Sequence, residues 1–211
     1  MKREYPILDI YYDNPNEASD MYLKYLIKDC EKNFIDVRIF DDVEKWMATR
    51  GGDAELFLEP TLHIEDWLKD SEINVDNPSA TAQGIFNYIT TNFKHRSNTI
   101  AVIGRGLVGK QLIDMLINYG YTVYEFNSKS NKDDMLNCIR DYADVVVGLA
   151  DKTIFDASTS FELYVEGITL IDSGYNFQVD DKSYKLMCGK WTRQVIIDRV
   201  LENYKKGLKN G

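Results

Sequence analysis

The sequence has few cysteines and few histidines, and neither set is arranged for cross-linking or metal binding. The three cysteines, Cys30, Cys138 and Cys188, are widely spaced and include no Cys-x-x-Cys pair. This pattern argues against a disulfide framework and against a zinc site. The two histidines, His63 and His95, have no partner pattern of a triad or a metal site. We therefore expect no metal, and surface or packing roles for both histidines.

Long apolar runs and an excess of positive charge are also missing. No segment approaches the length of a membrane span, and residues 1–5 do not open a signal peptide, so we expect a cytoplasmic protein that binds no membrane. The formal net charge is −9, whereas nucleic-acid binding requires a basic face. Apolar residues make up 44% of the 211 residues, which is enough for a sizeable core. A globular protein without a nucleic-acid partner is expected.

The most specific feature that is present is a glycine fingerprint between a strand and a helix. Residues 100–103 are apolar and predict a buried strand, while apolar residues recur with a helical period over residues 112–119. Gly104 permits a tight turn, Gly106 leaves room for a pyrophosphate, and Gly109 lets the helix pack close to the sheet. The phosphates then meet free backbone N–H groups at the helix start. The loop thus predicts a dinucleotide site, formed by Gly104, Arg105, Gly106, Leu107, Val108 and Gly109.

The end of the following strand indicates which dinucleotide binds. An NAD site places Asp or Glu there for the ribose hydroxyls, whereas NADP requires cations or hydroxyls in its place. The terminal position is Asn127, followed by Ser128, Lys129 and Ser130, and Arg105 adds a further cation. This favours NADP. NAD stays the alternative, with Glu125 in the acidic role, because Glu125 shares strand parity with Asn127.

Strand and helix patterns alternate along the chain, which predicts an α/β fold. Strands are expected at residues 5–12, 37–40, 55–58, 100–103, 120–127, 143–149 and 168–171. Helices are expected at residues 16–33, 43–49, 64–69, 79–92, 133–142 and 192–204, and another is expected after Gly109, with its apolar residues over 112–119. We predict two lobes: a small N-terminal α/β substrate lobe over 1–78, and a Rossmann-type lobe with a doubly wound parallel sheet over 79–211. The C-terminal helix, 192–208, can pack back on the first lobe.

Several segments are similar, in order and chemistry, to those of one known family. Residues 104–109 and 127–130 look like its Gly-Arg-Ser, Val-Gly and His-Ser-Arg/Lys-Thr motifs, and residues 171–176 look like its Ile-Asp-Val-Gly-Ile-Asn. Residues 143–147 resemble its Ala-Asp-Ile/Val segment, and residues 18–23 its Ala-Ser-x-x-Tyr-Val. Further matches are Lys28, Cys30, Glu31, Thr81 and Gly84. The chain therefore resembles the bifunctional methylenetetrahydrofolate dehydrogenase/cyclohydrolases.

The resemblance implies hydride transfer from methylenetetrahydrofolate to NADP, a tetrahydrofolate-type small-molecule partner and a homodimer. It also implies that Tyr22 stacks on the folate and that Asp76 binds it, while Asp172 and Gly174 border the nicotinamide. A purely structural role is the alternative to ligand binding for these residues. Tyr22 lies on a helical stripe that suits a core equally well. Asp76 also fits a turn or cap before Pro78, and Gly174 fits a left-handed turn.

The departures from the family limit the expected chemistry. The position of the family's catalytic lysine is Leu26, and the segment with its catalytic glutamine is replaced by residues 57–61. Leucine cannot transfer protons, whereas the cofactor carries the hydride chemistry. We therefore leave the catalytic residues unassigned and expect a dehydrogenase that has lost cyclohydrolase activity. The alternatives are an inactive relative that binds NADP or folate as a regulatory or interaction protein, and a lobe adapted to another small substrate.

Overall fold

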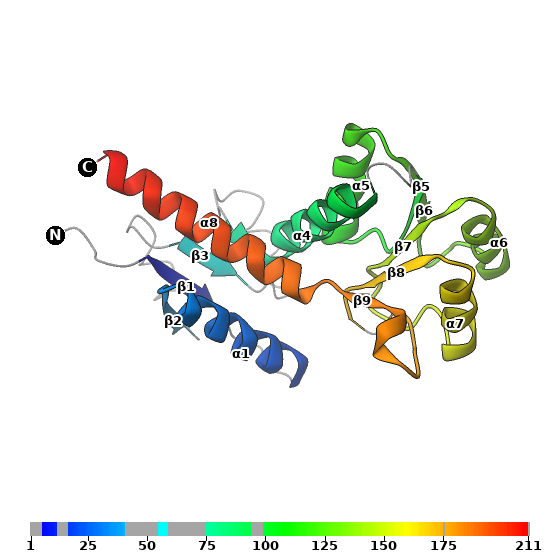
Figure 1. Cartoon of the computed structure of the whole chain (residues 1–211), viewed down its shortest axis with the longest axis horizontal. Helices are drawn as coiled ribbons and strands as arrows, with labels where there is room; N and C mark the ends of the chain where they lie inside the picture. Colours follow the sequence, from blue (N-terminus) through cyan, green and yellow to red (C-terminus); the bar gives the residue numbers. More distant parts are fainter. Residues whose placement is uncertain are drawn as a thin grey trace. The chain divides into compact units, whose positions relative to one another are not determined.

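The computed structural model of the chain divides into two compact units (Figure 1). The first unit comprises Met1–Ala80 and Thr192–Gly211, and the second comprises Thr81–Trp191. The structure describes residues 6–11, 17–40, 55–58, 75–93, 99–174 and 176–210. The helices expected at 43–49 and 64–69 lie outside the described residues, as do His63 and His95. No helix in the described ranges is both long enough and apolar enough to cross a membrane.

The first unit contains a small parallel sheet. Its strands are β1 (Ile7–Tyr11), β2 (Asp36–Phe40), β3 (Glu55–Leu58) and β4 (Val75–Asp76), arranged in the order β2-β1-β3-β4. Helix α1 (Glu17–Lys32) connects β1 to β2, as a parallel pair requires.

The apolar core of the first unit joins segments that are far apart in the sequence. Leu8 and Ile10 of β1 pack with Leu26 and Cys30 of α1, and with residues of helix α8 (Gly189–Asn210) such as Ile196. Leu26 and Cys30 are four residues apart and so lie on one face of α1. Burial raises the pKa of the Cys30 thiol to about 12, with the nearby Asp29 and Glu31 carboxylates adding to the effect, so this thiol stays protonated.

The second unit contains a five-stranded parallel sheet in the order β6-β5-β7-β8-β9. The strands are β5 (Thr99–Ile103), β6 (Thr122–Phe126), β7 (Val145–Gly148), β8 (Thr169–Asp172) and β9 (Leu186–Met187). The chain leaves β5 toward β6 on one side and then returns to β7 on the other. The carboxyl ends of β5 and β7 therefore mark the switch point at which such sheets bind ligands.

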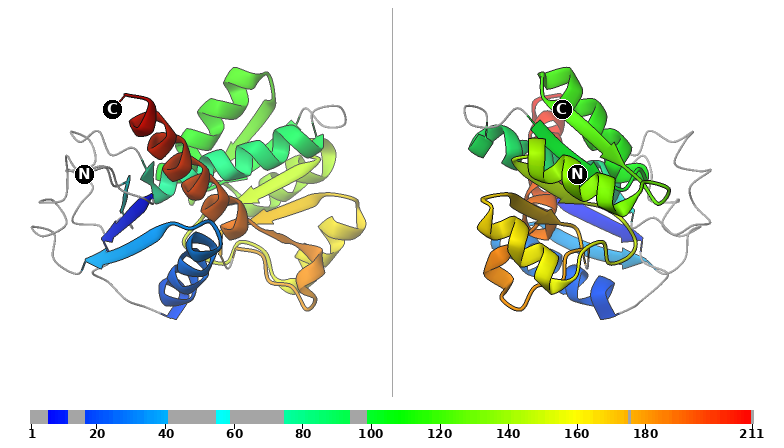
Figure 2. Two further views of the ribbon diagram at one scale, coloured as in Figure 1. Left: turned by 60° about the vertical axis from the view of Figure 1, so that its left-hand side comes forward. Right: turned by 90° about the vertical axis from the view of Figure 1, so that its right-hand side faces the viewer.

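Helices cover both faces of this sheet (Figures 1 and 2). The helices are α4 (Asn77–Phe93), α5 (Leu107–Tyr119), α6 (Lys132–Tyr142) and α7 (Ala157–Val165). Ile100 and Val102 of β5 pack with α4 and α5, whereas Ala101 and Ile103 belong to a second core with α6 and α7. Strands buried on both faces are continuously apolar, as β5 and β7 are. The expected doubly wound α/β fold is confirmed.

Most expected elements are present, with bounds shifted by a few residues, whereas α7 and the two-residue strands β4 and β9 were not expected. The α7 segment carries too little apolar periodicity to stand out, and only its ends signal a helix. The Asp156 side chain caps the start by accepting from the Thr159 N–H at 2.9 Å, and Gly167 with φ +88° follows the end. Those two residues are the signal that could have located it.

Candidate functional site

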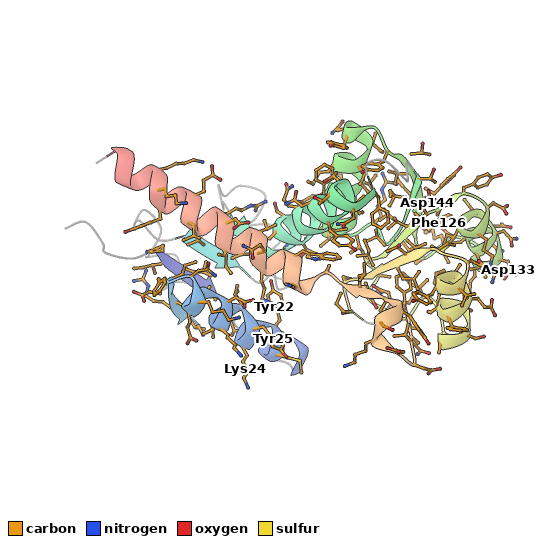
Figure 3. The ribbon with its side chains drawn as sticks, in the orientation of Figure 1. Tyr22, Lys24, Tyr25, Phe126, Asp133 and Asp144 are labelled. Carbon is orange, nitrogen blue, oxygen red and sulfur yellow. The ribbon has the colours of Figure 1, made fainter. Side chains whose placement is uncertain are left out.

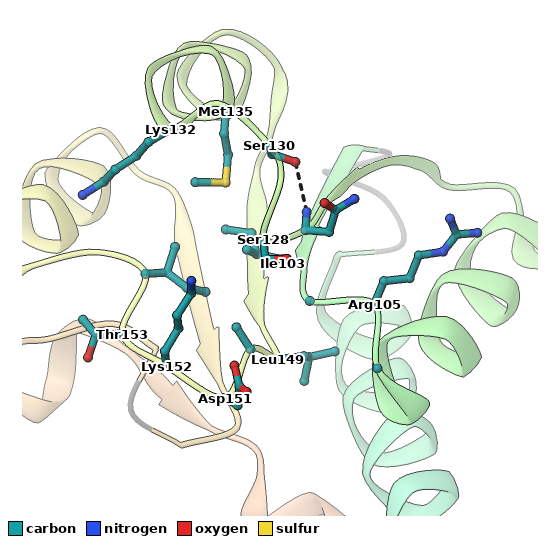
Figure 4. Close-up of a pocket in the computed structure, with 15 residues that line it drawn as sticks. Ile103, Arg105, Ser128, Ser130, Lys132, Met135, Leu149, Asp151, Lys152 and Thr153 are labelled. Carbon is teal, nitrogen blue, oxygen red and sulfur yellow. Dashed lines mark hydrogen bonds between the residues drawn. The ribbon is translucent and has the colours of Figure 1, made fainter.

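A cavity of about 680 Å³ opens at the carboxyl ends of β5, β6 and β7 (Figure 4). Its lining comes from the glycine loop after β5, the turn after β6, the start of α6 and residues 149–154 after β7. These loops meet because parallel strands end at one edge of the sheet. The cavity therefore occupies the switch point.

Each glycine of the loop has a physical reason in the structure. Gly104 has φ +114°, and a Cβ there would lie 2.6 Å from the backbone carbon of Leu149. A Cβ on Gly109 would lie 1.9 Å from the Gly104 oxygen, so α5 can approach the loop only with glycine at this position. A Cβ on Gly106 would meet nothing within 4 Å among the described residues. The middle glycine therefore faces open space, where a ligand can approach the backbone.

The start of α5 differs from the starts of the neighbouring helices. Asn131 caps α6 by accepting from the backbone N–H of Asp133 at 2.9 Å, and Asp156 caps α7 in the same way. By contrast, α5 starts after Gly106, and no side chain among the described residues caps it. No acidic residue stands in its first turn. Its first N–H groups, with the positive end of the helix dipole, therefore remain available to an anion.

The turn after β6 is shaped by two of the predicted site residues. The Asn127 N–H donates to Ser130 Oγ at 3.0 Å, and Asn127 Oδ1 accepts from the Lys129 N–H at 2.9 Å. Asn127, Ser128 and Ser130 line the cavity. Lys129 is described and exposed but does not belong to the lining. Hydroxyl groups, rather than an acid, therefore stand where β6 ends.

The cavity is locally positive in a chain with a net charge of −9. Of the described residues that line it, Arg105, Lys132 and Lys152 are basic and Asp151 is acidic. Glu125 lies outside the lining and pairs with Arg105, with Oε2 3.4 Å from the guanidinium Nε. Both side chains are partly exposed, so this pair is weak. The charge favours an anionic ligand.

Sequence reasoning missed Lys132 and Lys152. Lys132 is the first residue of α6, where a cation opposes the helix dipole. An unfavourable charge at that position was therefore a usable signal. Lys152 lies in an irregular loop, and no local pattern in the sequence points to it.

Asp172 and Gly174 are described but do not line the cavity. Asp172 ends β8 and is fully buried. Its Oδ1 accepts from the Gly174 N–H at 2.8 Å, and its Oδ2 lies 2.5 Å from the Lys185 ammonium. The carboxylate thus holds the loop after β8 in place.

The predicted substrate residues lie in the first unit. Tyr22 lies on α1 (Figure 3) and is half-buried. The guanidinium of Arg193 lies 5.8 Å from the centre of its ring. Arg193 also bonds Asp29 at 2.9 Å, which lowers the pKa of that carboxyl. Leu26 is fully buried in the core. The backbone of Asp76 in β4 pairs with that of Leu58 in β3, and the side chain of Asp76 lies outside the described part.

No protein-family model and no curated protein sequence matches the chain. Solved structures do match it over nearly its whole length. The bifunctional 5,10-methylenetetrahydrofolate dehydrogenase/cyclohydrolase of Thermoplasma acidophilum has a TM-score of 0.72 at 19% identity, covering 98% of this chain and 91% of that chain. The Trypanosoma brucei dehydrogenase-cyclohydrolase, complexed with NADP and inhibitor, has a TM-score of 0.72 at 12% identity, covering 96% and 88%.

A third match is the NAD-dependent 5,10-methylenetetrahydrofolate dehydrogenase of Saccharomyces cerevisiae. Its TM-score is 0.72 at 17% identity, and the match covers 98% of this chain and 89% of that chain. At these identities the likeness concerns the fold. The resemblance predicted from the sequence is confirmed at that level: this chain has the fold of the methylenetetrahydrofolate dehydrogenase/cyclohydrolases.

Proposed function

We propose that the protein is an NADP-dependent methylenetetrahydrofolate dehydrogenase that lacks cyclohydrolase activity. The observation that carries the proposal is the switch-point cavity, with its uncapped helix start and its three basic residues. This chemistry suits a dinucleotide with an additional phosphate. The fold likeness supports a folate one-carbon oxidoreductase as the general class.

The residues present fit the cofactor. The first N–H groups of α5, beside Gly106, would hold the pyrophosphate. Ser128, Arg105 and Lys132 would hold the 2′-phosphate, and the loop of residues 150–154 would wall the adenosine end. The nicotinamide supplies the hydride-accepting chemistry, while the protein binds and orients.

The glycine loop gives the first test, through two alanine variants. We expect Gly109→Ala to destabilise the fold by about 1–3 kcal/mol or more, because its methyl group would overlap the Gly104 oxygen. Gly106→Ala should stay within about 0.5 kcal/mol of wild type, since its methyl group enters open space. It should nevertheless weaken NADP binding by at least tenfold, because that space is where the pyrophosphate would lie. Urea unfolding and titration calorimetry measure the two effects, and unchanged binding by Gly106→Ala would contradict the assignment.

The choice of NADP over NAD is tested with adenosine fragments. Charge-assisted hydrogen bonds contribute about 1.5–3 kcal/mol, less when exposed, so Arg105→Met and Lys132→Met should each weaken 2′,5′-ADP binding about three- to tenfold. Binding of 5′-AMP, which lacks the 2′-phosphate, should change less than twofold. Lys129→Met is the matched control, because Lys129 lies in the same turn but outside the cavity. Equal losses for the two fragments would instead favour NAD.

The activity is tested with purified protein, NADP and methylenetetrahydrofolate. We expect methenyl absorbance to accumulate and to persist, since Leu26 replaces the lysine that the family resemblance associates with hydrolysis. Formation followed by decay of the absorbance would mean that cyclohydrolase activity is retained. Absence of any methenyl product would overturn the proposed dehydrogenase.

The burial of Leu26 also favours a second candidate, a catalytically inactive relative with a regulatory or interaction role. Where the family resemblance places an amine, this chain has apolar core. The methenyl assay separates the candidates, because the inactive relative would bind NADP or folate in titration calorimetry but would form no methenyl product. The proposed substrate is a tetrahydrofolate, and the proposed location is the cytoplasm. The proposed assembly is a homodimer, and the molar mass measured by light scattering tests it.

A further inference from the structure

The side-chain amide of Asn176 joins two loops of the second unit. The residue is only 1% exposed. Its Nδ2 group donates to the carbonyl oxygens of Ala150 at 2.5 Å and Lys152 at 2.9 Å. One buried amide therefore satisfies two carbonyls in the loop that follows β7, although its own backbone belongs to the loop that follows β8.

The backbone of Asn176 holds the same loop from its other end. The Asn176 carbonyl accepts from the N–H of Ile154 at 2.7 Å and from the N–H of Phe155 at 3.2 Å. The Asn176 N–H in turn donates to Asp172 Oδ1 at 3.2 Å. Residues 150–155 are thus held at both ends by one residue, which is itself held by a buried carboxylate.

These hydrogen bonds of Asn176, called the Asn176 clamp below, act on the residues that form the wall of the cavity. Residues 150–154 line the cavity, whereas Asn176 is described but is not part of the lining. Asn176 therefore influences a ligand only through the shape of the wall. The carbonyl oxygens of Ala150 and Lys152 are engaged by the Asn176 amide, which fixes the course of the loop that forms the wall.

The neighbouring sequence leaves room for this arrangement. A Cβ on Gly148, the last residue of β7, would lie 2.7 Å from the Asn176 Cβ and 2.8 Å from the Phe177 ring. Only glycine at this position lets Asn176 approach the loop after β7. The requirement at Gly148 is an observation independent of the hydrogen bonds.

We propose that Asn176 is a positioning residue for dinucleotide binding, and that its amide pre-shapes the wall of residues 150–154 against which the adenosine end of the ligand binds. This inference rests on the dinucleotide site of the proposed function. A pre-shaped wall spares the ligand the cost of ordering the loop, so the effect appears in affinity.

The test is the dissociation constant of 2′,5′-ADP for the full chain carrying Asn176→Asp. This change keeps the shape of the side chain and replaces its N–H donors by a carboxylate oxygen that faces two carbonyls. We expect the dissociation constant to rise at least tenfold. Gly148→Ala, which displaces Asn176 without altering it, should raise the constant in the same direction.

The control for a purely structural effect is Leu116→Ala, which opens a cavity in the core that α4 and α5 form with the sheet; Leu116 neither lines the ligand cavity nor belongs to the cluster of Phe155 and Phe177. This variant should lower stability and leave the dissociation constant within twofold of wild type. If Asn176→Asp does not fold, Asn176→Ser, with a smaller hydroxyl donor, takes its place with the same expected direction.

The outcomes separate the two proposals. Unchanged affinity in both the Asn176 and the Gly148 variants, beside tight binding by wild type, would overturn the positioning role alone. An equal loss of affinity in Leu116→Ala would overturn it as well, since the effect would then follow from stability. Failure of the wild-type protein to bind 2′,5′-ADP would overturn the cofactor site and the positioning role together.

Discussion

Leu26→Lys is expected to destabilise the protein by about 4–5 kcal/mol at neutral pH instead of supplying a catalytic amine. Leu26 is fully buried among Leu8, Ile10 and Cys30. Burial of this kind lowers a lysine pKa by about 3–5 units from its normal value of about 10.4. At pH 7 only the roughly three units between that pH and the normal pKa count, at about 1.4 kcal/mol each. Urea unfolding at neutral pH measures the loss.

The pH dependence of the variant identifies the cause. A buried lysine has a folded-state pKa below its unfolded-state pKa, so the unfolded chain binds more protons between the two values. The stability of Leu26→Lys should therefore rise, relative to wild type, as the pH increases from the lowered pKa toward the normal lysine pKa. Leu26→Met conserves volume and should cost less than about 1.5 kcal/mol. Stability equal to that of Leu26→Met, or a gain of cyclohydrolase activity, would mean that position 26 reaches a polar site.

Lys185→Met is expected to lower the free energy of unfolding by about 3–5 kcal/mol, because it leaves a buried carboxylate without its cation. The side chain of Asp172 is 0% exposed and that of Lys185 is 12% exposed, with 2.5 Å between the charged atoms. The Lys185 ammonium also donates to the Phe177 carbonyl at 2.6 Å, so the loop after β8 loses a second bond. Chemical unfolding measures the effect.

Two further variants control this prediction. Lys182→Met removes an exposed lysine from the same segment and should change stability by less than about 0.5 kcal/mol. Asp172→Asn in the Lys185→Met background should recover part of the loss, because it removes the stranded charge. A loss in Lys185→Met no larger than that in Lys182→Met would mean that the pair contributes little to the fold.

Most of the cofactor-binding part of the site could be predicted from the sequence, because each of its segments depends on a short sequence pattern. The strand before Gly104, the helix after Gly109 and the turn at Asn127 each follow from a short pattern, and the structure brings these segments around one cavity. The position of Lys152 at the cavity could not be predicted, because its loop has no periodicity and its location depends on where β7 lies in the sheet. The Asn176 clamp was equally hidden, since it joins two loops that are distant in the chain.

The substrate-binding part was harder to predict, because the same apolar pattern on a helix can indicate two different roles. Tyr22, Leu26 and Cys30 follow a spacing that suits a ligand-binding face as well as a core face. The structure buries Leu26 and Cys30 against α8, and leaves Tyr22 half-buried beside Arg193. The partner residues on α8 are more than 150 positions away, so no local pattern identifies them.

The sequence by itself determined the alternation of strands and helices, the glycine loop and the turn at Asn127, because backbone sterics and side-chain periodicity act over a few residues. Only the tertiary structure decided that Lys132 and Lys152 face the cavity, that Glu125 turns to Arg105, and that Leu26 is core. Those outcomes depend on strand order and on packing between distant segments. Such packing is a property of the whole fold, and no short stretch of sequence encodes it.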